Sequence, residues 1–86
     1  MNKDFLIQVR VKNARMRAAM DAAGVRSLVE LSRTTGVGYR KISDIYRFAR
    51  SPVDVNGQWH GWVETLAAAL DCSPVDIWPE YLVRLN

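Results

Sequence analysis

The chain has 86 residues, of which 49% are hydrophobic and 24% charged, so its composition favours one small folded domain over a disordered segment. A chain of this size buries roughly 60–65% of its unfolded surface, so we expect one modest core without a large enclosed catalytic pocket. The single cysteine, Cys72, excludes an intrachain disulfide, and no apolar run approaches the roughly 20 residues that span a bilayer.

The net charge is only +3, but the charged residues are unevenly distributed along the chain. Residues 26–50 carry six basic side chains against two acidic ones, whereas residues 51–86 carry one basic side chain against five acidic ones. This segregation favours an anionic partner, with nucleic acid as the first candidate. The alternative is an ordinary solvated face, and charge alone leaves both interpretations open.

The first predicted element is a short strand over residues 5–11, FLIQVRV, in which apolar side chains alternate along one side. Its partner would be a small hairpin at residues 53–59, which contains an Asn-Gly turn signal, or the same strand of a second subunit. The apolar stretch is too short and interrupted for a signal peptide, so we expect a cytoplasmic protein. We therefore divide the chain into a strand or arm at 1–12 and a domain at 13–86.

Two helices are predicted next. Asn13 is a good N-cap, and apolar residues at helical spacing lead to Gly24, where a first helix would end; these residues are Met16, Ala19, Met20 and Ala23. Ser27 and Glu30 have the spacing of a capping box and would open a second helix that Gly36 ends. Its inner face would carry Leu28, Leu31, Ser32 and Thr35.

Three further helices follow. The third would run over about residues 38–48, with Ile42, Ile45 and Phe48 facing inward, before a loop at 51–57. The fourth would place Trp62, Val63, Leu66, Ala69 and Leu70 on its apolar face. Ser73, Pro74 and Asp76 would open the fifth, Pro79 would break it, and Tyr81, Leu82 and Leu85 would close the core.

The second and third predicted helices meet the mechanical needs of a helix-turn-helix. Such a motif requires a tight turn, a small residue where the helices cross, apolar anchors and a polar outer face that enters a DNA groove about 12 Å wide. Ser32 would be the small residue at the crossing and Gly36 the turn glycine. The anchors would be Leu31, Val37, Ile42 and Ile45.

The stretch SLVELSRTTGVGYRKISDIYR, residues 27–47, resembles the helix-turn-helix of the phage-repressor and Cro-type regulators. The later TLAAALDCSPVDIWPE, residues 65–80, is similar to the fourth and fifth helices of that family. The resemblance covers about residues 13–82. It implies a mainly α-helical fold, a lambda-repressor-like bundle of about five helices, with the third as recognition helix.

The resemblance also implies a function. The expected protein is a sequence-specific transcription regulator of the phage or prophage kind, such as a repressor, which binds double-stranded DNA and is not an enzyme. We expect no cofactor, no metal, no small-molecule ligand and no membrane. A homodimer would read two half-sites about one helical turn apart. Its subunits would meet through the strand at 5–11 or the apolar run IWPEYLVRL at 77–85.

In that family the first two exposed residues of the recognition helix usually read bases, and so does the position five residues after the first. This assigns base reading here to Tyr39, Arg40 and Asp44. Arg40 could bond to guanine O6 and N7, and Asp44 could accept from cytosine N4 or orient Arg40 or Lys41. The residues expected at DNA phosphates are Gly38, Lys41, Ser43, Arg47, Arg50 and Arg33.

The chain departs from the family pattern at several places. Leu28 stands where a phosphate-binding glutamine is common, Thr35 replaces an apolar anchor, and the loop containing VNGQWHGW, residues 55–62, is longer than typical. Its tryptophans suit a core or an interface better than base stacking, because their neighbours are acidic. The alternative function is therefore a protein-interaction module on a helix-turn-helix scaffold, such as an antitoxin or a phage accessory factor.

Overall fold

The computed structural model describes residues 12–81. The strand expected at 5–11 lies outside the described residues, as do Leu82 and Leu85 of the expected core. Five helices form the described part: α2 (Ala14–Ala23), α3 (Leu28–Thr35), α4 (Tyr39–Tyr46), α5 (Gly61–Ala69) and α6 (Pro74–Ile77). The prediction of a mainly α-helical bundle is confirmed.

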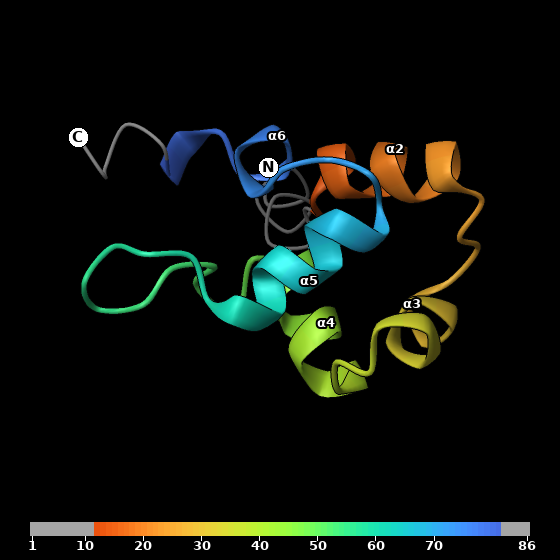
Figure 1. Ribbon diagram of the computed structural model, residues 1–86, viewed down its shortest axis with the longest axis horizontal. Helices are drawn as coiled ribbons and strands as arrows, with labels where there is room; N and C mark the ends of the chain where they lie inside the picture. The colour runs from red at the N-terminus through yellow and green to blue at the C-terminus, as the bar shows by residue number, and fades with distance from the viewer. Residues whose placement is uncertain (1–11, 82–86) are drawn as a thin grey trace, which may run out of the picture.

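The helices form two edges around a central element. In Figure 1, α3 and α4 lie along the lower edge, α2 and α6 lie along the upper edge, and α5 runs between them. Helix α3 packs on α4 and α5, while α6 packs on α2 and α5. Because of this arrangement, α4 has one side against the core and one side at the border of the molecule.

Asn13 caps α2 and joins it to two other helices. Its side-chain oxygen accepts a hydrogen bond from the Met16 amide at 2.9 Å, as predicted for an N-cap, and Gly24 ends the helix with a left-handed φ of 78°. The Asn13 amide group donates to the carbonyl of Ile77 at 3.2 Å, and its backbone N–H donates to the carbonyl of Tyr46 at 2.9 Å. Asn13 is only 2% exposed, and these bonds satisfy it inside the bundle.

The predicted cap of α3 is present with one change of partner. Ser27 Oγ accepts from the Glu30 amide at 3.1 Å, as a capping box requires. The Glu30 carboxylate accepts from the Arg26 amide at 2.9 Å, one residue before its usual partner. At the other end, Gly36 has a φ of 82°, which side chains other than glycine rarely adopt.

The core is built mostly from the predicted positions. Buried apolar side chains come from every helix and from the turn before α4: Met16, Met20, Leu31, Val37, Ile42, Ile45, Val63, Leu66, Ala67, Leu70, Ile77 and Trp78. Ala23 and Ala69, which we expected on inner faces, are exposed. The buried residues of α5, which begins at Gly61, are three and four positions apart. This spacing includes Ala67 in place of Ala69.

Phe48 was also expected to face inward, and this prediction is wrong. Helix α4 ends at Tyr46 with Arg47 as its C-cap, two residues earlier than predicted. Phe48 then takes a left-handed φ of 61°, and its side chain is 48% exposed. The chain reverses direction at this residue, so helical spacing no longer decides where the side chain points.

The loop between α4 and α5 extends away from the bundle (Figure 1). The hairpin expected at 53–59 is reduced to one antiparallel bridge between Val53 and Trp59. Asp54 Oδ1 closes the loop by accepting from the amides of Asn56 at 2.8 Å and Gln58 at 3.0 Å. These hydrogen bonds, that of Gln58 first, lower the pKa of Asp54 below its ordinary value. Val55, at the tip, is fully exposed.

Candidate nucleic-acid interface

Three short hydrogen bonds fix the turn between α3 and α4. Ser32 Oγ donates to the carbonyl of Val37 at 2.7 Å, which ties the middle of α3 to the residue just before α4. Thr35 Oγ1 donates to the carbonyl of Leu31 at 2.8 Å and accepts from the Val37 amide at 3.1 Å. Ser32 therefore contacts the turn that leads into α4, and Thr35 satisfies the Val37 amide, which an apolar anchor would leave open.

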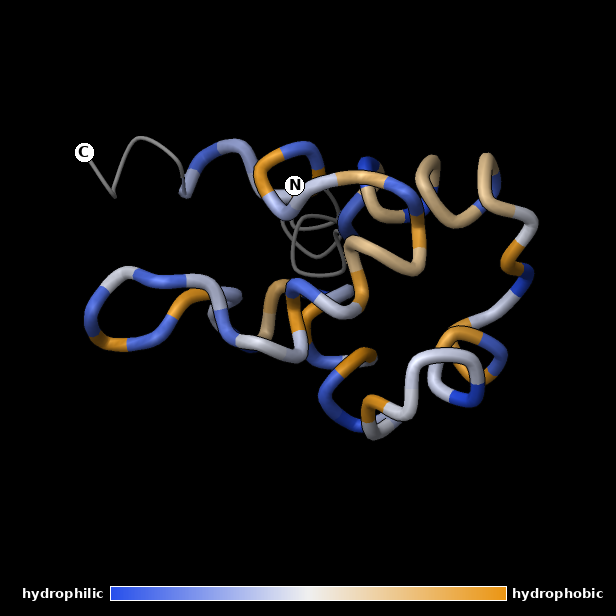
Figure 2. Tube along the Cα trace, viewed as in Figure 1, coloured by the Kyte–Doolittle hydropathy of each residue, from blue (hydrophilic) through white to orange (hydrophobic). Residues whose placement is uncertain are grey.

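Helix α4 separates its two faces cleanly. Ile42 and Ile45 are fully buried beneath it, whereas Tyr39 is 51% exposed and both Arg40 and Lys41 are exposed. Hydrophilic and hydrophobic colours alternate along α4 in Figure 2. The outer face therefore stays open to solvent, which a groove-reading helix requires.

The first turn of α4 carries positive charge where helix stability would favour negative charge. Gly38 at the N-cap offers no side-chain hydrogen bond, the first turn contains no acidic residue, and its second and third positions are Arg40 and Lys41. The helix dipole makes this end favourable for anions and unfavourable for cations. Within residues 12–81, the Arg40 side chain forms no hydrogen bond or ion pair. A local cost of this kind is expected at functional positions.

At the other end of α4, two arginines form ion pairs with the same carboxylate. Asp44 forms ion pairs with Arg47 at 3.0 Å and with Arg50 at 3.2 Å, and Arg47 Nε donates to the carbonyl of Ser43 at 3.3 Å. Asp44 was expected to contact a base or to orient Arg40 or Lys41, but its partners in the molecule are Arg47 and Arg50. Arg47 lies one helical turn away, and the chain reversal at Phe48 returns Arg50 to the same carboxylate.

The remaining predicted residues lie around this helix. Gly38 is exposed with an extended backbone, and a Cβ added there would meet nothing within 4 Å. Ser43 is half-buried, and Arg33 is exposed in the last turn of α3. Arg33 forms no ion pair with Asp44 among the described residues, so it is not one of the arginines that this carboxylate holds.

Sequence reasoning missed an aromatic stack beside α4. Lys41 Nζ lies 5.5 Å from the centre of the Trp62 ring, within the range of a cation–π contact. His60 stacks on Trp62, with ring centres 5.5 Å apart and planes inclined by 13°. The spacing of aromatic residues in QWHGW was the only signal, and it did not indicate that Lys41 would lie against them.

The loop's other tryptophan has a structural role. Trp59 packs against Trp78 and Tyr81, with ring centres 6.4 Å away in both cases. Trp78 is 1% exposed, and its indole nitrogen has no hydrogen-bond partner within residues 12–81. These contacts hold the base of the loop against the chain that follows α6.

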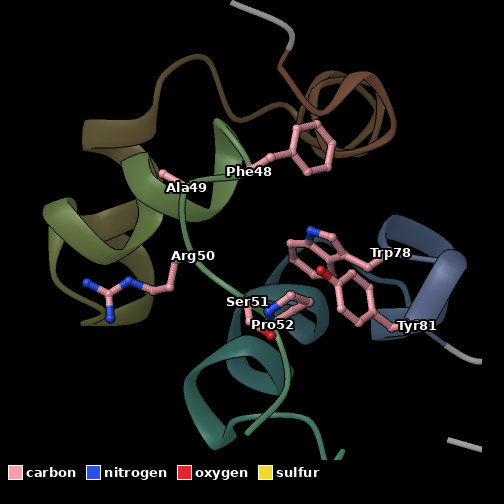
Figure 3. A pocket seen from close by; sticks show the side chains of 7 residues that line it. All are labelled: Phe48, Ala49, Arg50, Ser51, Pro52, Trp78 and Tyr81. Carbon is pink, nitrogen blue, oxygen red and sulfur yellow. The ribbon is translucent and has the colours of Figure 1, made fainter. Parts of the chain in front are cut away.

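A cavity of about 200 Å³ lies between the end of α4 and α6 (Figure 3). Its lining residues are Phe48, Ala49, Arg50, Ser51, Pro52, Trp78 and Tyr81. The Arg50 guanidinium extends away from Trp78 and Tyr81 in Figure 3, so the one cation of the lining does not point at the aromatic wall.

Residues 12–81 hold no cluster of side chains that could bind a metal ion. No three of the His, Cys, Asp and Glu side chains there are close enough to hold a metal ion. Burial, followed by the charges of Asp76 and Asp71, raises the pKa of the Cys72 thiol, which keeps it protonated near neutral pH. Over the same part of the chain, every helix is too short or too polar to cross a bilayer.

Comparisons with protein-family models, with curated proteins and with solved structures found no match to this chain.

Proposed function

We propose that the protein is a sequence-specific, double-stranded DNA-binding transcription regulator of the phage-repressor and Cro type, working in the cytoplasm. The observation that carries the proposal is the first turn of α4, where exposed Tyr39, Arg40 and Lys41 stand above buried Ile42 and Ile45. A rigid helix with a cationic, solvent-exposed outer face suits the major groove of a duplex.

The residues of α4 would divide the work. Arg40, which has no partner among the described residues, is free to bond bidentately to a guanine edge, and Tyr39 beside it would contact bases or their sugars. Lys41, Arg47 and Arg50 would contact phosphates, together with Arg33 from α3 and the exposed turn at Gly38. A homodimer would place two such helices in successive major grooves.

Selection from random duplex DNA would first identify a preferred site, and fluorescence anisotropy would then compare variants on it. Arg40→Ala should relax base preference at one position. Lys41→Ala should weaken binding to all sequences alike and reduce the slope of log K against log salt by about 1. Equal binding of the parent and both variants to the selected duplex would refute this division of roles.

A protein-interaction module is the second candidate, favoured by the fully exposed Val55 at the loop tip and by exposed Phe48. The salt response separates the two. A DNA binder loses affinity steeply as salt rises because it releases counterions from phosphates, whereas apolar docking through the loop would not.

A further inference from the structure

The Lys41–Trp62–His60 stack joins the recognition helix to the long loop. Trp62 is the second residue of α5, is half-buried and packs against the hydrophobic core. Its ring carries Lys41 of α4 at 5.5 Å and His60 of the loop at 5.5 Å. The anchored indole of Trp62 therefore contacts two nitrogen-bearing side chains, Lys41 and His60, which come from different segments beside α4.

Holding Lys41 in place matters for a contact with phosphate. A free lysine has several rotatable bonds and loses much of that freedom when it binds an anion. A lysine already resting on an anchored ring loses less, and its charge remains available because the ring contact does not neutralise it. Arg40, the adjacent cation, has no such support among the described residues. The Trp62 ring therefore restrains Lys41 and not Arg40.

We infer that Trp62 is a positioning residue for DNA binding, which fixes Lys41 and, with His60, extends the phosphate-facing surface from α4 onto the start of α5. The inference rests on the proposed DNA-binding function. The ligand is the sugar-phosphate strand flanking the major groove, so the effect should be independent of base sequence.

Six proteins test this inference by fluorescence anisotropy on a selected and on a random duplex. They are the parent, Trp62→Leu, Trp62→Phe, Lys41→Gln, and Trp62→Leu and Trp62→Phe each in a Lys41→Gln background. Trp62→Leu should weaken binding to both duplexes by about two- to fivefold, the size of an exposed cation–π contact, and Trp62→Phe by less. In the Lys41→Gln background, Trp62→Leu should have no further effect. Trp59→Leu is the matched control, because Trp59 packs on Trp78 and Tyr81 and should change stability but not affinity.

Proton NMR of the DNA-free protein provides a readout that a merely structural role would not produce. The Lys41 side-chain protons should be shifted upfield by the Trp62 ring current, and the shift should vanish in Trp62→Leu. If Trp62→Leu does not fold, Trp62→Phe still tests the inference, since its effect on affinity should disappear when Lys41 is replaced by Gln.

Different results would refute DNA binding and the positioning role of Trp62. A parent protein without salt-dependent affinity for any duplex would refute DNA binding and this inference with it. The inference alone would be refuted if the parent bound DNA and Trp62→Leu bound it equally well. It would also be refuted if Trp62→Leu lowered the affinity by the same factor in the Lys41→Gln background as in the parent.

Discussion

The two glycines of the turn before α4, Gly36 and Gly38, differ in backbone conformation. Gly36 has a φ of 82°, whereas Gly38 has a φ of −59° and open space around its missing side chain. Only the first therefore needs to be glycine for conformational reasons. Gly38 is exposed at the helix start, where a small residue lets an anion approach the backbone.

These glycines make a matched pair for a stability experiment. Gly36→Ala should lower the free energy of unfolding by about 1–2 kcal/mol, because alanine is strained in the left-handed region. Gly38→Ala should lower it by less, about 0.5 kcal/mol, because alanine is a poorer N-cap than glycine but the backbone there is not left-handed. Urea denaturation followed by circular dichroism measures both, and equal losses in the two variants would contradict the assignment.

At the scale of elements, the short helix α6 begins with a side-chain cap of its own. Asp76 accepts from the Ser73 backbone amide at 2.9 Å and from Ser73 Oγ at 3.1 Å. These two hydrogen bonds, the backbone one first, lower the pKa of Asp76 from 3.8. The cap positions Ile77 and Trp78 under the bundle, so a local ionisation supports core packing.

The pH dependence of this cap has a definite sign. Because the pKa of Asp76 is lower in the folded than in the unfolded protein, the ionised cap stabilises the fold above the unfolded value of 3.8. That contribution should be lost as the pH falls through the folded value. An NMR titration should place the Asp76 carboxyl below 3.8, and Ser73→Ala, which removes one donor, should move it back towards 3.8. A titration at 3.8 or above in the parent would count against the cap.

At the scale of the whole molecule, the sequence predicted those features that depend only on residues close together in the chain. Caps at Asn13 and Ser27, glycines at helix ends and the spacing of apolar residues were sufficient for the five helices and most of the core. Phe48 was misplaced because the end of α4 depends on how the chain reverses. The ion pair of Asp44 with Arg50 and the contact of Lys41 with Trp62 depend on where the chain runs after α4, which no local spacing encodes.

Part of the acidic segment lies away from the basic helices. Helix α6, which carries Asp76, lies along the edge opposite α3 and α4 (Figure 1). Asp44 is the exception, a carboxylate within the cationic surface of α4, 18% exposed and shared by Arg47 and Arg50. Within the proposed function, this carboxylate would restrain two phosphate-binding arginines and reduce non-specific affinity.

Asp44→Asn tests this balance of charge. Removing the carboxylate should release Arg47 and Arg50 and tighten binding to every duplex, with a steeper decline of log K as log salt rises. If Asp44 instead accepts from a cytosine, the variant should change base preference at one position and leave the salt slope unaltered. Anisotropy titrations at several salt concentrations, on selected and single-base variant duplexes, distinguish these outcomes. Glu80→Gln removes an exposed carboxylate that forms no ion pair with Arg47 or Arg50, so as the control it should alter the slope much less than Asp44→Asn does.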